Sequence, residues 1–284
     1  MTKNHKGEYS LLNKDFSVLM SLYIKEKPEF FSACMDSMIS QTRKPSQIVI
    51  VKDGPLTDAL EDRLSAYISL YPDIYTIISL KENRGLGQAL AEGIQHCNYE
   101  LVARMDTDDV SRKDRFEKQL AEFEADPELD ICGSHILEFD NDTARIVTRR
   151  KVPINDAEIK EYQKRRDAFN HVTVMYKKSS VLKAGNYQSC MFMEDTLLWV
   201  HMIQSECKCK NVDDYLVYVR IGQDMYERRG GLAYFKKYKS GRKKIYDTGY
   251  ISGLDYYYTL LVQFIVCILP NHLRGMIFKE LLHG

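Results

Sequence analysis

The chain has 284 residues, and its 40 acidic and 40 basic side chains leave no formal net charge at pH 7. This length suits one large domain, or one domain with an appendage. A neutral chain offers no overall attraction for nucleic acid, so we expect no nucleic-acid partner. Cys207 and Cys209 form a lone C-x-C without the second ligand pair of a zinc site. The polar N-terminus lacks the apolar core of a secretory signal, which predicts a cytoplasmic protein.

Strands and helices alternate through the first half of the chain. Buried strands are predicted at residues 16–23, 47–53, 75–80, 99–106 and 129–139. Helices are predicted at residues 28–41, 56–71, 87–97 and 111–126. Ser111 is the expected N-cap of the last of these helices. This alternation with short connections indicates an α/β fold, in which helices flank a Rossmann-like, mostly parallel central sheet.

The pattern is looser after residue 140. Strands are predicted at residues 145–153, 171–178 and 215–222, and an amphipathic helix at residues 195–205. The remainder is expected to be helical. We therefore predict a main domain over residues 1–230 and a helical C-terminal extension over residues 231–284.

Residues 256–269 form an uncharged, largely apolar segment that is followed by Pro270. A membrane-spanning helix needs about 20 such residues, so this segment is too short to cross a bilayer. It is either a buried core helix or a segment that lies in a membrane interface. The lysine-rich stretch at 234–246 is correspondingly either a solvated helix face or a basic surface that meets anionic lipid.

Several loops are expected to meet at one edge of the sheet. Ligands of open α/β sheets bind outside the carboxyl ends of the strands. The loops at that edge are Ser21–Tyr23, Asp53–Gly54, Asn83–Gly87 and Asp106–Asp109. We therefore predict a single binding crevice there.

The last of these loops follows a strand in the segment "ARMDTDD". In an extended backbone Asp106 and Asp108 point to the same side. Paired carboxylates suit Mg²⁺ or Mn²⁺, which complete their coordination with water and substrate phosphates. Taken alone, so short a motif fits better with a solvated acidic turn that caps the next helix.

The surrounding motifs favour the metal. The segments "ARMDTDD" with "DRFEKQ", "MEDTLLW" (193–199) and "VRIGQDMYERRGG" (219–231) occur in the order found in one enzyme family. They resemble the family 2 glycosyltransferases of the GT-A fold, in the branch that builds bacterial capsule and exopolysaccharide. The resemblance covers roughly residues 16–230. It implies a UDP-sugar donor, with galactose weakly preferred, and Mn²⁺ or Mg²⁺ held by Asp106 and Asp108.

The resemblance also implies roles for residues on the donor side. Ser21 and Tyr23 correspond to nucleotide contacts, and Asp53 to the loop that holds base and ribose. Asn83 and Arg84 correspond to the loop that closes over the nucleotide, and Asp106 to a donor contact as well as a metal ligand.

Two donor-side details stay open. Lys52 replaces the first acidic residue that many family members carry, which leaves the identity of the base open. Asp109 either caps the following helix or supports the metal ligands from behind.

On the acceptor side, the resemblance implies that Asp195 is the general base and Glu194 its neighbour. A carboxylate beside another carboxylate has a raised proton affinity, which suits a base. Both acids are also typical of a helix N-terminus without any catalytic role. Arg228 and Arg229 either bind pyrophosphate or are surface charges.

Two further residues lie near this motif. His171 is expected to pack or to contact the acceptor rather than to bind metal. Trp199 is expected to pack against the sheet, with stacking on a sugar as the alternative.

The resulting prediction is an inverting hexosyltransferase, peripheral on the inner face of the membrane. It would act on a lipid-linked saccharide and contact the membrane through its C-terminal region. The first alternative is a nucleotide-sugar-binding partner of an assembly complex that has no activity of its own. The second is a phosphoacceptor or phosphatase with Asp53 as nucleophile.

Overall fold

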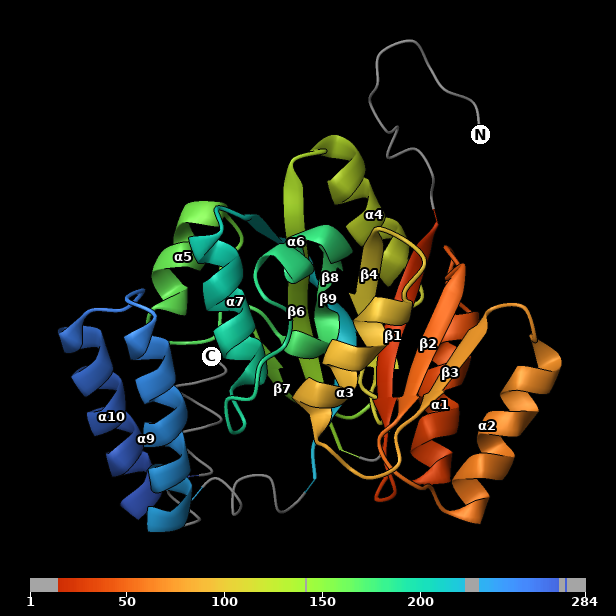
Figure 1. Ribbon diagram of the computed structural model, residues 1–284, viewed down its shortest axis with the longest axis horizontal. Helices are drawn as coiled ribbons and strands as arrows, with labels where there is room; N and C mark the ends of the chain where they lie inside the picture. The colour runs from red at the N-terminus through yellow and green to blue at the C-terminus, as the bar shows by residue number, and fades with distance from the viewer. Residues whose placement is uncertain (1–14, 141, 223–229, 271–273, 275–284) are drawn as a thin grey trace.

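A computed structural model describes residues 15–140, 142–222, 230–270 and 274. Nine strands of these residues form one mixed sheet in the order β3-β2-β1-β4-β8-β6-β9-β5, with β7 beside β6 (Figure 1). The strands are β1 (Phe16–Leu22), β2 (Gln47–Lys52), β3 (Tyr75–Ser79), β4 (Leu101–Arg104), β5 (Val110–Ser111), β6 (Leu129–Phe139), β7 (Ile146–Arg150), β8 (Met175–Lys177) and β9 (Lys208–Arg220).

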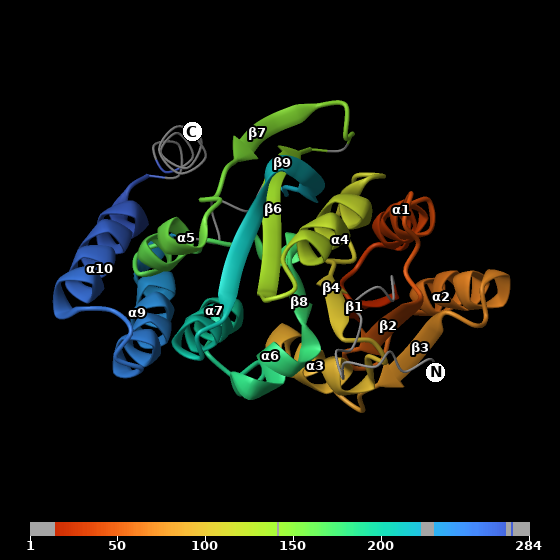
Figure 2. The same cartoon turned by 90° about the horizontal axis from the view of Figure 1, so that it is seen from above.

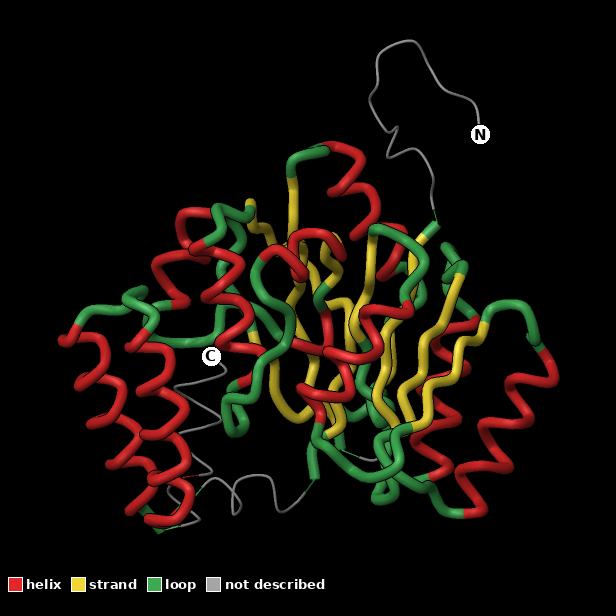
Figure 3. Tube along the Cα trace, viewed as in Figure 1, coloured by secondary structure: helices red, strands yellow, loops and turns green. Residues whose placement is uncertain are grey.

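The first four strands are parallel. Ser17 pairs with Gln47 between β1 and β2, and β4 lies on the other side of β1. Strand β8 runs antiparallel between β4 and β6, whereas β6 and β9 are again parallel. Because β1, β2 and β4 run in the same direction, their carboxyl ends meet at one edge. Figure 3 shows the connecting loops gathered there. The predicted α/β class with a mostly parallel sheet is confirmed.

Helices cover both faces of the sheet (Figure 2). One face is covered by α1 (Pro28–Ile39), α2 (Asp58–Leu70) and α4 (Arg115–Ala125). The other face is covered by α3 (Leu86–Gly93), α5 (Asp156–Gln163), α6 (Lys178–Lys183) and α7 (Glu194–Gln204). Short 3₁₀ turns lie at Ile94–His96 and His171–Thr173. Each face of the sheet therefore packs against its helices through a separate apolar core.

The C-terminal region is helical, as predicted. Helices α9 (Gly231–Asp247) and α10 (Gly253–Ile268) form a hairpin that packs against α7. The contact buries side chains of all three helices, namely Leu197, Val200, Ile245, Tyr256 and Leu260. In the described residues no helix is both long and apolar enough to cross a membrane.

Three predicted starts are wrong by four residues or more. The strand predicted at 171–178 begins only at Met175, because His171–Thr173 form a 3₁₀ turn. Ser111 does not cap α4, because it lies in β5 and pairs with Val217 of β9; the helix begins at Arg115 instead. Strand β9 begins at Lys208 rather than at 215. Its pairing with β6 skips from Val212 to Tyr215, so the acidic pair between them bulges from the ladder. That charged interruption obscured the first half of the strand.

Candidate active site

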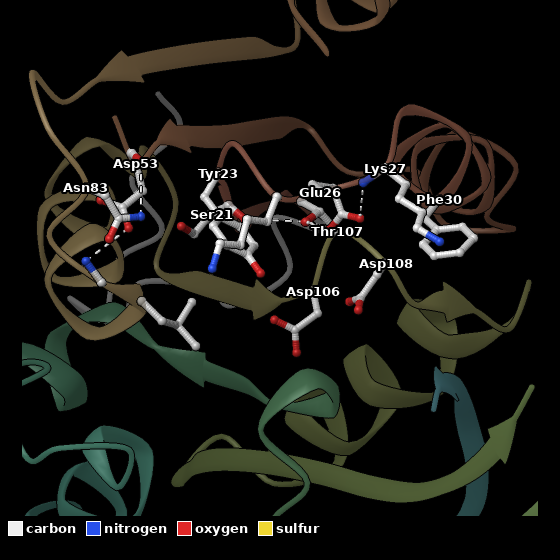
Figure 4. A pocket seen from close by; sticks show the side chains of 13 residues that line it. Ser21, Tyr23, Glu26, Lys27, Phe30, Asp53, Asn83, Asp106, Thr107 and Asp108 are labelled. Atoms are coloured by element: carbon white, nitrogen blue, oxygen red, sulfur yellow. Dashed lines mark hydrogen bonds between the residues drawn. The ribbon is translucent and has the colours of Figure 1, made fainter. Parts of the chain in front are cut away.

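A cavity of about 540 Å³ opens at the carboxyl ends of β1, β2 and β4. Figure 4 shows Asp53 and Asn83 at one end and Asp106 with Asp108 at the other. The lining residues are Ser21, Tyr23, Lys25, Glu26, Lys27, Phe30, Asp53, Asn83, Gly85, Leu86, Asp106, Thr107 and Asp108. The four predicted loops therefore meet in one crevice.

Asp53 organises the loop that follows β3. Its two carboxylate oxygens accept the backbone N–H groups of Arg84 at 2.7 Å and Gly85 at 3.0 Å. The carbonyl of Asp53 accepts the Asn83 side-chain amide at 3.3 Å. A Cβ on Gly54 would lie 2.8 Å from the backbone nitrogen of Asn83, so glycine permits this close approach. The Asp53 carboxylate thus holds the loop in place, which argues against Asp53 as a nucleophile.

The positions of Lys52 and Arg84 explain their absence from the cavity wall. The Lys52 ammonium pairs with Glu61 of α2. Arg84 contributes its backbone N–H to the loop, and its side chain is not part of the lining. The unusual lysine is therefore part of a helix–strand contact.

Asp106 forms an ion pair with Arg104, a fully buried residue at the end of β4. Burial favours protonation of Asp106, but the charge of Arg104 and its hydrogen bond to the carboxylate outweigh it and hold the pKa of Asp106 below the usual value. We did not single out Arg104 from the sequence. The sequence did contain a signal for this pair: Arg104 and Asp106 are two residues apart at a strand end, and such residues point to the same side.

Asp108 has a different environment. Burial, Asp106 and Glu26 together raise its pKa to about 7. Two neighbouring carboxylates of which one resists ionisation are a donor set that a divalent cation would stabilise. No described group of three or more His, Cys, Asp or Glu side chains could hold a metal ion. Asp106 and Asp108 therefore fit Mn²⁺ or Mg²⁺ only if water and a donor diphosphate supply the remaining ligands.

Asp109 supports this loop from behind. Its carboxylate accepts the backbone N–H of Arg220 at 2.7 Å, at the end of β9. It is buried and does not cap α4, whose N-cap is Asp114. The sequence left open whether Asp109 caps the next helix or supports Asp106 and Asp108 from behind. The contact with Arg220 agrees with the second interpretation.

Glu194 and Asp195 begin α7 beside this cavity. A Cβ added to Gly87 would lie 2.6 Å from Cγ of Glu194, so the first turns of α3 and α7 touch. Gly85 and Leu86, just before this contact, line the cavity. Burial raises the pKa of Glu194. Burial, Asp167 and Glu194 raise the pKa of Asp195 to about 7, a value that suits a proton acceptor near neutral pH.

Four candidate residues remain, namely Trp199, His171, Arg228 and Arg229. Trp199 is fully buried and lies edge-on to Phe169, with ring centroids 5.6 Å apart. Its predicted packing role is confirmed, and stacking on a sugar is not possible from there. His171 Nε2 lies 3.0 Å from the Tyr187 hydroxyl. Arg228 and Arg229 lie outside the described residues.

Comparison with known proteins identifies the family. Residues 17–185 match the model of glycosyl transferase family 2. The chain is 35% identical over 268 residues to the amylovoran biosynthesis glycosyltransferase AmsE of Erwinia amylovora, covering 93% of this chain and 98% of that protein. It is 32% identical over 267 residues to the UDP-Gal:alpha-D-GlcNAc-diphosphoundecaprenol beta-1,3-galactosyltransferase of Escherichia coli, covering 94% and 96%.

A solved structure agrees in fold. The mannosyltransferase PcManGT of Pyrobaculum calidifontis, in complex with GDP-Man and Mn²⁺, matches with a TM-score of 0.61 at 14% identity, covering 92% of this chain and 71% of that one. The fold, the sequence relatives and the family model agree: the chain belongs to glycosyl transferase family 2. It is a glycosyltransferase with the GT-A fold, and its relatives act in bacterial polysaccharide synthesis.

Proposed function

We propose that this glycosyltransferase moves a hexose, with inversion, from a UDP-sugar to a lipid-linked saccharide. The observation that most supports this proposal is the contact between Gly87 and Glu194, which joins the wall of the proposed donor cavity to the helix that bears Asp195. The Escherichia coli relative is named for UDP-Gal and for an acceptor on diphosphoundecaprenol. This supports UDP-galactose as the first donor to test and a lipid diphosphate as the anchor of the acceptor.

In the proposed reaction, Asp195 takes the proton of the acceptor hydroxyl. The acceptor oxygen forms a bond to the anomeric carbon, and the bond from that carbon to the donor phosphate breaks. The electron pair leaves with the nucleoside diphosphate, so attack from the opposite face inverts the configuration. Asp106 and Asp108 would hold Mn²⁺ or Mg²⁺, which when bound offsets the charge of the diphosphate. Alignment of donor and acceptor supplies much of the remaining catalysis.

The donor side of the proposal rests on the cavity lining. Ser21, Tyr23, Asn83 and the loop held by Asp53 are assigned to the nucleotide and its ribose. Lys25 and Lys27 add positive charge to the same wall and are suited to phosphate oxygens. We did not select these two lysines, which lie on the turn after the first strand, from the sequence.

A donor-binding protein without activity is the second candidate. Such a protein would need the carboxylates at Asp106 and Asp108 but no proton acceptor across the cavity. The raised pKa of Asp195, which follows from its burial and from Asp167, favours the enzyme.

The function can be tested by transfer to a synthetic GlcNAc-diphospholipid in Mn²⁺, with UDP-galactose, UDP-glucose and UDP-N-acetylglucosamine as donors. We expect one donor to be used, and Asp195→Asn to slow single-turnover transfer by about 10²–10⁴-fold. Binding of UDP by calorimetry should change little in that variant. UDP-sugar binding without transfer to any acceptor would favour the second candidate.

We also propose that the α9–α10 hairpin rests on the inner face of the membrane. A shallow basic cavity of about 470 Å³ is lined by Lys236, Lys239, Ser240, Lys243, Lys244 and Tyr256. Next to it, α10 turns apolar side chains to solvent, including Leu254 at 83%, Tyr257 at 70% and Leu261 at 60% exposure. An apolar helix face that is exposed to solvent beside lysines is typical of binding at an anionic lipid surface. This arrangement would bring the lipid-linked acceptor to α7.

A further inference from the structure

His171 links Asp195 to a buried pair of tyrosines. Its Nδ1 lies 3.8 Å from Oδ2 of Asp195, and its Nε2 lies 3.0 Å from the hydroxyl of Tyr187. The Tyr187 hydroxyl is in turn 3.4 Å from that of Tyr176. A line of polar groups thus runs from the sheet interior to the proposed base.

The chemistry of Asp195, His171 and Tyr187 determines which of these groups donates each hydrogen bond. Burial and the charge of Arg104 lower the pKa of His171 to about 3, so the imidazole is neutral and carries one proton. An ionised carboxylate only accepts hydrogen bonds, so the nitrogen that faces Asp195 is the one that bears the proton. Nε2 then accepts a hydrogen bond from Tyr187, which remains a donor because burial raises its pKa.

The imidazole is held rigidly. Trp199 packs edge-on against the His171 ring, with centroids 5.8 Å apart. Asn186, in a left-handed conformation at φ 62°, accepts the Tyr187 backbone N–H at 2.7 Å. The Asn186 amide donates to the carbonyl of Ala91 in α3 at 3.0 Å. The ring and its tyrosine partner are therefore fixed to the rigid part of the fold.

Asp195 is less constrained. Its Oδ1 accepts the N–H of Thr196 at 2.8 Å, while its side chain remains 28% exposed. Oδ2 is the oxygen that faces His171. The gap of 3.8 Å is longer than a hydrogen bond, and such contacts often shorten only when the reacting groups are bound.

We propose that His171 is a positioning residue of the transfer reaction, whose Nδ1–H orients the Asp195 carboxylate toward the acceptor hydroxyl and whose tautomer is set by Tyr187. The inference rests on the proposed function, since it assumes that Asp195 is the base. His171 does not touch either substrate in this scheme. It acts only through the carboxylate.

The test compares His171→Leu with His171→Asn. Leucine removes the donor, whereas the amide of asparagine places an N–H near the original Nδ1. We expect His171→Leu to lower kcat by about 10–100-fold, the cost of a misplaced catalytic group. His171→Asn should retain most of kcat, and UDP binding by calorimetry should be unchanged in both. The matched control is His135→Leu, because His135 is also buried and faces an aspartate, Asp213, at 3.1 Å; kcat should not change.

A double variant separates positioning from general damage. If His171 acts through Asp195, adding His171→Leu to Asp195→Asn should cost little beyond Asp195→Asn alone. Full additivity, or equal losses in His171→Leu and His171→Asn, would overturn the inference. Near-normal transfer by Asp195→Asn would instead remove the base assigned under the proposed function. A slow Asp195→Asn with a normal His171→Leu would reject only the role of His171.

Discussion

Arg104, the last residue of β4, forms an ion pair with Asp106 in the loop that follows; the guanidinium is fully buried and the carboxylate reaches the cavity. Within the described residues, Nε and Nη1 of Arg104 have no hydrogen-bond partner. The cation is therefore committed to Asp106, which keeps that carboxylate ionised while Asp108 has a raised pKa. Asp106 and Asp108 therefore lie close together but differ in proton affinity, with Asp108 the stronger proton acceptor.

Replacing Arg104 tests this relationship. Arg104→Met leaves Asp106 without its cation, and because that carboxylate is 37% exposed we expect a loss of about 1 kcal/mol in unfolding free energy. UDP binding in Mn²⁺ should weaken as well. Denaturant unfolding and calorimetry measure the two effects. Arg145→Met, at an exposed arginine before β7, is the control and should be neutral. Unchanged stability in Arg104→Met would show that the pair contributes nothing to the fold.

The metal proposal predicts that UDP binds far more tightly in Mn²⁺ than in EDTA. Asp108→Asn should abolish that difference, because a neutral amide is a poor ligand and leaves the diphosphate charge uncompensated. Calorimetric titration with UDP measures both states. Asp73→Asn, on an exposed turn before β3, should behave as the native protein. Equally tight binding by the native protein in EDTA would exclude the metal role.

The pH dependence of transfer follows from Asp195. Its pKa is raised to about 7, and only the ionised carboxylate can accept a proton. The rate should therefore be highest above neutral pH and fall about tenfold per pH unit well below 7. Single-turnover rates at saturating Mn²⁺ and donor are the measurement. A rate that stays flat from pH 5.5 to 7.5 would contradict this assignment.

Gly87→Ala should displace the start of α7. The new Cβ would meet Cγ of Glu194 at 2.6 Å and push away the helix that bears Asp195. We expect kcat to fall by about 10²-fold, as for a small misplacement of a catalytic group. Gly253→Ala, in the first turn of α10 with open space around it, is the matched control. If the two variants transfer equally well, the α3–α7 contact does not position the base.

Membrane binding should depend on the basic face of α9. Charge reversal at Lys236, Lys239 and Lys243 should reduce co-sedimentation with anionic vesicles, and salt should reduce binding by the native protein. The control reverses Lys44, Lys81 and Lys113, which are exposed in the N-terminal half. Equal binding by both triple variants would reject the hairpin as the docking surface.

Sequence patterns were sufficient to predict which loops line the cavity. Strand periodicity and short loops placed Ser21, Asp53, Asn83 and Asp108 at one sheet edge, because parallel strands end together. These are properties of local pattern and topology, which a single sequence carries. The metal-binding role proposed for Asp106 and Asp108 came instead from the resemblance to family 2 glycosyltransferases, because the short motif alone favoured a solvated acidic turn.

The contacts made by Glu194 and Asp195 could not be derived in this way. The contact of Gly87 with Glu194 and that of His171 with Asp195 join segments far apart in the chain, and neither pair has a spacing that marks it. The environment of Arg104 is equally a product of packing. Such contacts depend on how α3, α7 and β8 pack together, which periodicity alone does not determine.

Helix α7 has two apolar faces with different partners. Leu198 and Trp199 face the sheet, whereas Leu197 and Val200 face the α9–α10 hairpin. If the acceptor binds beside α7 as proposed, an exchange of acceptor specificity between two family members would have to transplant α7 and the hairpin as one block. A chimera joined just before α9 would pair one parent's α7 with the other parent's hairpin. A junction in the connection that precedes α7 would keep those interlocking side chains from a single parent.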